Sequence, residues 1–200
     1  MPRVVVLDYG SGNLRSAQRA LERVGARVEV TADPDAVLDC DGLAVPGVGA
    51  FAACMAGLRA AGGDKLIARR LELGRPVLGI CVGMQVLFAA GVEHGTWTDG
   101  CGAWPGTVER LDAGVLPHMG WNTVTPPPGS ALFAGIAPGT RFYFVHSFRV
   151  DCEPAATLAG CTYGEEFAAA IAAGNVAGVQ FHPEKSHRFG LQLLSNFAAT

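Results

Sequence analysis

Short apolar runs alternate with amphipathic segments through the first half of the chain. The Val-rich run 3–7 ends at a glycine-rich loop, and apolar residues then recur at spacings of three and four: Leu14, Ala17, Leu21 and Val24. This spacing predicts a helix. Further strands are expected at 27–30, 43–45 and 76–80, and further helices at 51–59 and 64–73. Repeated strand–helix units predict an α/β fold with a mostly parallel sheet and right-handed crossovers.

The segment 102–151 has a different pattern, richer in Pro, Gly, Thr and aromatic residues. Its alternation places four side chains on one side of a strand: Phe142, Phe144, His146 and Phe148. We expect antiparallel strands here, added to the same sheet. A last core strand is expected at 176–181 and a closing helix at 189–198. Because one core can grow to about 250 residues before it splits, residues 1–200 are expected to form a single domain.

Composition narrows the class of protein. Half of the residues are hydrophobic and 16% are charged, so the chain can bury a large core. The net charge is −3 and there is no basic tract, which argues against a nucleic-acid partner. The apolar stretch 76–92 is shorter than the roughly 20 residues of a membrane span. We interpret it as a buried strand followed by a buried helix, with no membrane association.

The chain has six cysteines, and none of them forms a C-x-x-C pair. A chain of this size does not need disulfide bonds for stability, so a reduced cytoplasmic compartment fits best. Each cysteine is then either core filler or a nucleophile.

Cys81 stands in the run Gly79-Ile80-Cys81-Val82-Gly83, where a buried strand is expected to turn into a helix. This spacing resembles a nucleophile elbow, in which small flanking residues leave room for a tight crossing. N–H groups of the following helix would favour a thiolate. The alternative is a core cysteine flanked by glycines by chance, since glycine is abundant in this chain.

His182-Pro183-Glu184 follows the last core strand directly. A residue before proline favours an extended conformation, which would turn His182 and Glu184 to the same side. Since both Cys81 and His182 follow core strands, they can meet at one sheet edge as nucleophile and base, with Glu184 as orienter. A structural His–Glu pair and a metal site that adds His187 are the alternatives.

The run Pro46-Gly47-Val48-Gly49 lies between an expected strand and an expected helix. Its glycines can turn backbone N–H groups inward, as the oxyanion of an acyl-transfer reaction requires. Taken alone, the run is more typical of an ordinary strand-to-helix turn.

Together, the segments 79–85 and 182–184 resemble the class I (triad) glutamine amidotransferase family. Further segments are similar to the glutaminase subunits of imidazole glycerol phosphate synthases: 8–16, 46–49, 117–122, 143–147 and 182–186. The resemblance runs from residue 4 to residue 198. It implies a flavodoxin-like, mostly parallel open sheet with flanking helices and added antiparallel strands.

The resemblance also implies a mechanism. Cys81 would attack the side-chain amide of glutamine, and His182, oriented by Glu184, would carry a proton to the leaving ammonia. Backbone N–H groups of Val48 and Val82 would hold the oxyanion, after the strand at 47–49 reorganises. Substrate glutamine would be held by Gly49, Gln85, Ser147 and Phe148. Neither a cofactor nor a metal ion is implied.

The implied partner is a cyclase subunit with a (β/α)8 barrel, which would form a heterodimer with this chain and receive the ammonia. Its products would be imidazole glycerol phosphate and aminoimidazole carboxamide ribotide, in histidine biosynthesis. The implied interface residues are Asn13, Met119, Trp121, Asn122 and Lys185. A buried core position is the alternative for Trp121, but the Met-Gly-Trp-Asn loop beside Pro117 favours an exposed contact.

Other functions stay open at this stage. The chain could serve another synthase, such as one for anthranilate or pyridoxal phosphate, but the Gly-x-Gly-Asn loop at 10–13 argues against this. A peptidase, a deglycase or a cysteine variant of an α/β hydrolase would not predict His-Pro-Glu after the last strand. A non-enzymatic phosphate-binding module would use the loop at 10–13, which has neither a full dinucleotide pattern nor a P-loop lysine.

Overall fold

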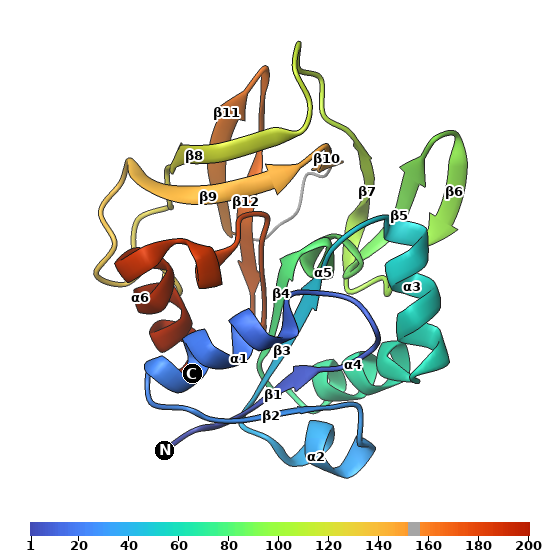
Figure 1. The fold of residues 1–200 in the computed structure, drawn as a ribbon, viewed down its shortest axis with the longest axis vertical. Helices are drawn as coiled ribbons and strands as arrows, with labels where there is room; N and C mark the ends of the chain where they lie inside the picture. Colours follow the sequence, from blue (N-terminus) through green and yellow to red (C-terminus); the bar gives the residue numbers. More distant parts are fainter. Residues whose placement is uncertain (152–156) are drawn as a thin grey trace.

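A seven-stranded sheet forms the centre of the computed structural model, which describes residues 1–151 and 157–200 (Figure 1). Its order is β11-β12-β13-β4-β3-β1-β2. Five strands run parallel: β1 (Arg3–Leu7), β2 (Arg27–Thr31), β3 (Gly42–Gly47), β4 (Val77–Cys81) and β13 (Val176–Val179). β11 (Thr157–Tyr163) and β12 (Glu165–Ala173) extend one edge in antiparallel orientation. The mostly parallel α/β sheet is therefore confirmed.

Helices cover both faces of this sheet (Figure 1). α1 (Leu14–Arg23) packs beside α6 (His187–Ala198), while α4 (Gly63–Glu72) packs beside α3 (Phe51–Ala60) and α2 (Pro34–Asp39). Every residue of β3 and β4 is buried, as expected for central strands covered on both sides.

The remaining strands form two smaller sheets. β5 (Phe88–Glu93), β6 (Thr96–Asp99), β7 (Trp104–Arg110) and β10 (Phe148–Asp151) make a four-stranded sheet in the order β10-β7-β5-β6. β8 (His118–Val124) and β9 (Thr140–His146) make an antiparallel ribbon. Along β9 the expected alternation is present, with Phe142, Phe144 and His146 buried, whereas Phe148 begins β10 and is half-buried.

Two expectations for these segments are wrong. The strands of 102–151 belong to the two smaller sheets, and the antiparallel strands added to the main sheet are β11 and β12. The helix expected within 76–92 is only α5 (Val82–Gln85), after which the chain enters β5. An unbroken apolar run lacks the periodicity that distinguishes a helix from a buried strand.

Five cysteines are free thiols: Cys40, Cys54, Cys81, Cys101 and Cys161. Cys152 lies outside the described residues. Within residues 1–151 and 157–200, no helix combines the length and the apolar character needed to cross a membrane.

Candidate active site

Cys81 occupies a tight turn between β4 and α5. Its backbone has φ 57° and ψ −117°, a left-handed conformation that costs a non-glycine residue about 1–3 kcal/mol. A Cβ atom at Gly79 would lie 2.5 Å from the Gly83 carbonyl oxygen, and one at Gly83 would lie 1.8 Å from that of Val45. The crossing therefore requires glycine on both sides of Cys81, as the elbow hypothesis expects.

His182 and Glu184 form a buried pair beyond β13. Nδ1 of His182 lies 2.7 Å from Oε1 of Glu184, and each side chain is 2% exposed. The expected extended segment is wrong for Glu184, because Pro183–Lys185 forms a 3-10 turn, η1. Pro183 fits the first position of a helical turn, and this turn brings the carboxylate back to the imidazole.

The charge of His182 is set by its two neighbours. Burial alone would lower the pKa of its imidazole, but interactions with Cys81 and Glu184 outweigh burial and raise that pKa to about 10. The ring is therefore protonated at neutral pH. Nε2 of His182 and Oε2 of Glu184 are buried and have no hydrogen-bond partner among the described residues. Of these two residues only His182 lines the pocket that contains Cys81, so its Nε2 is the atom that can meet a ligand.

One pocket of about 190 Å³ gathers most of the predicted site residues. It is lined by Cys81, His182, Val48, Val82, Gly49, Gln85, Ser147, Phe148, Asn13 and Lys185 among others. Four predicted residues do not line it. Glu184 lies behind His182, which separates it from the pocket. Met119, Trp121 and Asn122 lie on β8, in the neighbouring β8–β9 ribbon.

The backbone of Val48 is bound to Ser11. The Val48 N–H donates to Ser11 Oγ at 3.2 Å, and the same hydroxyl donates to the Val48 carbonyl oxygen at 2.9 Å. Cys54 Sγ also donates to this carbonyl at 3.3 Å. The N–H group expected in the oxyanion hole is therefore occupied here, while Val82 begins α5, where N–H groups lack partners within the helix.

Comparison with known proteins identifies the family. Residues 5–200 match the family model for class-I glutamine amidotransferases. The chain belongs to this family.

Curated relatives within the family share more than half of its residues. The chain is 63% identical over 197 residues to the imidazole glycerol phosphate synthase subunit HisH of Mycobacterium tuberculosis (strain CDC 1551 / Oshkosh), covering 97% of this chain and 96% of the relative. It is 60% identical over 208 residues to the HisH subunit of Thermobifida fusca (strain YX), covering 100% and 99%. The resemblance noted from the sequence motifs is thus confirmed.

Solved structures agree on the fold. A structure titled PurLQS from Thermotoga maritima has a TM-score of 0.74 at 23% identity, with 98% of this chain and 97% of the other covered. Another glutamine amidotransferase has a TM-score of 0.77 at 19% identity, with 98% and 99% covered. The flavodoxin-like sheet of class I amidotransferases is therefore confirmed for this chain.

Two polar residues of this amidotransferase lie at the site although the sequence motifs did not point to them. Glu93 lines the pocket, and its Oε2 accepts a hydrogen bond from the Phe51 N–H at 3.0 Å. Gln180 is fully buried, and its Nε2 lies 3.7 Å from Cys81 Sγ. Glu93 was detectable as the polar residue that ends the apolar run 86–92, and Gln180 as the polar residue within the apolar run 176–181.

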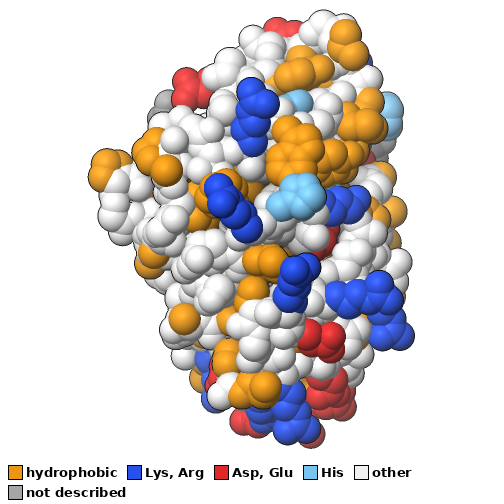
Figure 2. Space-filling model, turned by 60° about the vertical axis from the view of Figure 1, so that its left-hand side comes forward, with side chains coloured by type: hydrophobic (Ala, Val, Ile, Leu, Met, Phe, Trp, Pro, Cys, Tyr) orange, Lys and Arg blue, Asp and Glu red, His pale blue; other side chains and the backbone are white. Residues whose placement is uncertain are grey.

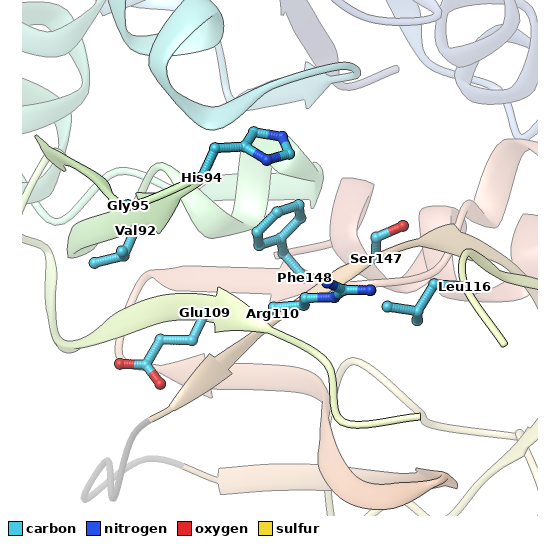
Figure 3. A pocket seen from close by; sticks show the side chains of 8 residues that line it. All are labelled: Val92, His94, Gly95, Glu109, Arg110, Leu116, Ser147 and Phe148. Carbon is cyan, nitrogen blue, oxygen red and sulfur yellow. The ribbon is translucent and has the colours of Figure 1, made fainter. Parts of the chain in front are cut away.

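A larger pocket of about 770 Å³ adjoins the first, and the two share Ser147 and Phe148. Figure 3 shows the ring of Phe148 below His94, with Arg110 and Ser147 nearby. The larger pocket is therefore contiguous with the one that contains Cys81.

The amidotransferase also presents an apolar surface on β8. Met119 is 62% exposed and Trp121 is 43% exposed, so the core alternative for Trp121 is wrong. The Trp121 ring stacks on His187, with centroids 5.0 Å apart. Figure 2 shows hydrophobic side chains beside a histidine on this face, bordered by Lys and Arg. Within residues 1–151 and 157–200, no three His, Cys, Asp or Glu side chains are placed together as a metal site would require.

Proposed function

We propose that this amidotransferase is the glutaminase subunit of an imidazole glycerol phosphate synthase and releases ammonia through Cys81, His182 and Glu184. The observation that carries the proposal is the strained Cys81 elbow, which shares one pocket with His182, whose Nδ1 is paired with the buried Glu184 carboxylate. The high identity to HisH subunits supports the choice of synthase.

The first chemical step is acyl transfer to sulfur. The Cys81 thiolate attacks Cδ of the substrate amide, and the carbonyl becomes a tetrahedral oxyanion. Protonated His182 then gives its Nε2 proton to the amide nitrogen as the C–N bond breaks. Ammonia leaves, and a glutamyl thioester remains on Cys81.

The second step is hydrolysis of the thioester. His182, now neutral, accepts a proton from water, which attacks the thioester carbonyl. The C–S bond breaks, glutamate leaves, and the thiolate–imidazolium pair is restored. Glu184 keeps Nδ1 of His182 as a donor through both steps, which leaves Nε2 to carry the proton.

Oxyanion stabilisation requires a change at Val48. The proposed donors are the N–H groups of Val48 and Val82, and the Val48 N–H must leave Ser11 before it can reach the oxyanion. Gly49 has φ 88°, and glycine adopts φ of either sign, so the backbone next to Val48 has little steric barrier to such a change. The isolated chain is therefore proposed to be a poor glutaminase until a partner shifts this strand.

Substrate binding is assigned to Gly49, Gln85, Ser147 and Phe148. A pocket of about 190 Å³ suits a small amino acid. The NH2 group of Gln85 donates to the Phe148 carbonyl oxygen and to Gln180 Oε1. Oε1 of Gln85 is left free to accept a hydrogen bond from the substrate amide. The carboxylate of Glu93 offers a negative charge to the ammonium group of glutamine.

The partner is proposed to be the cyclase subunit, a (β/α)8 barrel, docked on Met119, Trp121 and Asn122. Asn13 and Lys185 would join this interface to the pocket, since both line the pocket that contains Cys81. Ammonia would then enter the cyclase without passing through solvent. We propose that residues 1–200 act as one cytoplasmic domain, consistent with the free thiols of the described cysteines.

The test is glutamate release from glutamine, measured with and without the matching cyclase subunit and its nucleotide ligand. We expect strong stimulation by the liganded partner and no release by Cys81→Ala in either condition. Release without stimulation would assign the chain to another synthase. Equal release by Cys81→Ala would refute the proposed nucleophile.

A further inference from the structure

Gln180 is a polar side chain in the apolar interior of the main sheet. It follows β13 directly, is fully buried, and its backbone N–H donates to the Ala169 carbonyl at 2.8 Å. A buried amide without partners destabilises a protein, so such a side chain is normally fully hydrogen-bonded. Its partners here are Gln85 and Cys81.

The direction of these hydrogen bonds is fixed by one backbone carbonyl. Nε2 of Gln85 lies 3.1 Å from the Phe148 carbonyl oxygen, which can only accept, so this end of Gln85 is the NH2 group. The same NH2 group lies 2.9 Å from Gln180, which must therefore present its oxygen. The remaining Gln180 atom, Nε2, faces Cys81 Sγ at 3.7 Å.

The sulfur of Cys81 thus lies beside one hydrogen-bond acceptor and one hydrogen-bond donor. The Val145 carbonyl oxygen, at 3.9 Å, can only accept, so it suits the neutral thiol. The NH2 group of Gln180 can only donate, so it suits the thiolate. Turning the Gln180 amide around would place two NH2 groups against each other, and Gln85 prevents this.

We propose that Gln180 is a positioning residue for the nucleophile, donating an N–H to the Cys81 thiolate from an orientation that Gln85 enforces. This inference rests on the proposed function, since it concerns the same sulfur. It also gives Gln85 a second task, because the NH2 group that orients Gln180 is separate from the Oε1 left for substrate. The protonated ring of His182 supplies the charge opposite the thiolate, and Gln180 fixes where the sulfur lies.

The test is the alkylation rate of Cys81 by iodoacetamide in the full chain, followed by mass spectrometry of the Cys81 peptide from neutral to high pH. Gln180→Met keeps the volume and removes the donor. Gln180→Glu keeps an acceptor for Gln85 and places an oxygen toward the sulfur. Gln192→Met, on the exposed side of α6, controls for the chemistry of the substitution.

We expect alkylation at neutral pH to slow about three- to tenfold in Gln180→Met, the size expected of one long hydrogen bond to an anion. Gln180→Glu should be slower still, and the control unchanged. The differences between the rates should narrow as pH rises, because the thiolate is the form that iodoacetamide alkylates. Wild-type rates in both Gln180 variants, or equal losses at every pH, would overturn the inference.

Glutamate release by the wild-type complex separates this inference from the proposed function. If the wild-type complex is active while the Gln180 variants alkylate normally, only the role of Gln180 fails. If the wild-type complex releases no glutamate, the proposed function itself fails.

Discussion

Removing the hydroxyl of Ser11 should raise the glutaminase activity of the isolated chain. Ser11 Oγ accepts from the Val48 N–H at 3.2 Å and donates to the Val48 carbonyl at 2.9 Å. Both contacts exist only while the Val48 N–H is turned to Ser11 and away from an oxyanion. Ser11→Ala removes both, so the resting conformation loses stability relative to the reorganised one.

The magnitude follows from the hydrogen bonds lost. Each neutral hydrogen bond contributes about 0.5–1.5 kcal/mol net, so the pair contributes about 1–3 kcal/mol. A shift of that size changes a two-state population about 5- to 150-fold. Two contacts remain to hold the strand, from Cys54 Sγ to the Val48 carbonyl and from the Tyr9 hydroxyl to the Pro46 carbonyl. We therefore expect the low end of the range, about a five- to tenfold rise.

The assay is glutamate release at saturating glutamine, without the cyclase subunit. Ser16→Ala is the matched control, because Ser16 is exposed on α1. Activity with the liganded partner should change little, since the partner already favours the reorganised strand. A basal rate equal to that of the wild type, in a Ser11→Ala variant that keeps its melting temperature, would refute this account of Val48.

Two further predictions concern the partner surface and the response to acid. Trp121→Ala should weaken binding of the cyclase subunit more than it lowers the melting temperature, because the ring is 43% exposed; titration calorimetry and thermal unfolding measure the two effects. Burial lowers the pKa of His146 to about 4, so between about pH 6.5 and 4 the unfolded chain binds a proton that the folded chain does not. The free energy of unfolding should therefore fall as pH falls through this window, by up to about 1.4 kcal/mol per pH unit, and less steeply in His146→Gln when followed by urea unfolding.

Each of these two predictions would be contradicted by a specific result. A large loss of melting temperature with unchanged partner affinity would make Trp121 a structural residue. An equal acid slope in wild type and His146→Gln would assign the loss of stability to other groups.

The meeting of Cys81 and His182 was predictable from the sequence because both follow core strands of a parallel sheet. β4 and β13 are direct neighbours, with Ile80 opposite Val179. Cys81 follows Ile80 and His182 comes three residues after Val179, so both lie at the same edge of the sheet. The sequence indicated the shared edge but contained no signal for strand order. That order depends on pairing between segments about 100 residues apart.

Other parts of the structure were not predictable for identifiable reasons. β12 contains the alanine-rich segment 168–173, whose intrinsic preference is helical, and only pairing with β11 and β13 makes it a strand. The pairing of His182 with Glu184 was expected, but through an extended segment and not through the 3-10 turn that forms. The Ser11–Val48 contact joins two loops, and no periodicity encodes it.

The strain at Cys81 yields a final prediction that separates stability from function. Inside helices and strands Ala is more stable than Gly by about 0.5–1 kcal/mol, because glycine loses more conformational freedom on folding. At φ 57° the preference should reverse, since alanine carries the same strain as cysteine and glycine does not. Urea unfolding should therefore show Cys81→Gly at least as stable as Cys81→Ala, with both inactive. If Cys81→Ala is instead the more stable by the usual margin, the elbow is unstrained, and the glycines at 79 and 83 serve only the close packing of α5 against β3 and β4.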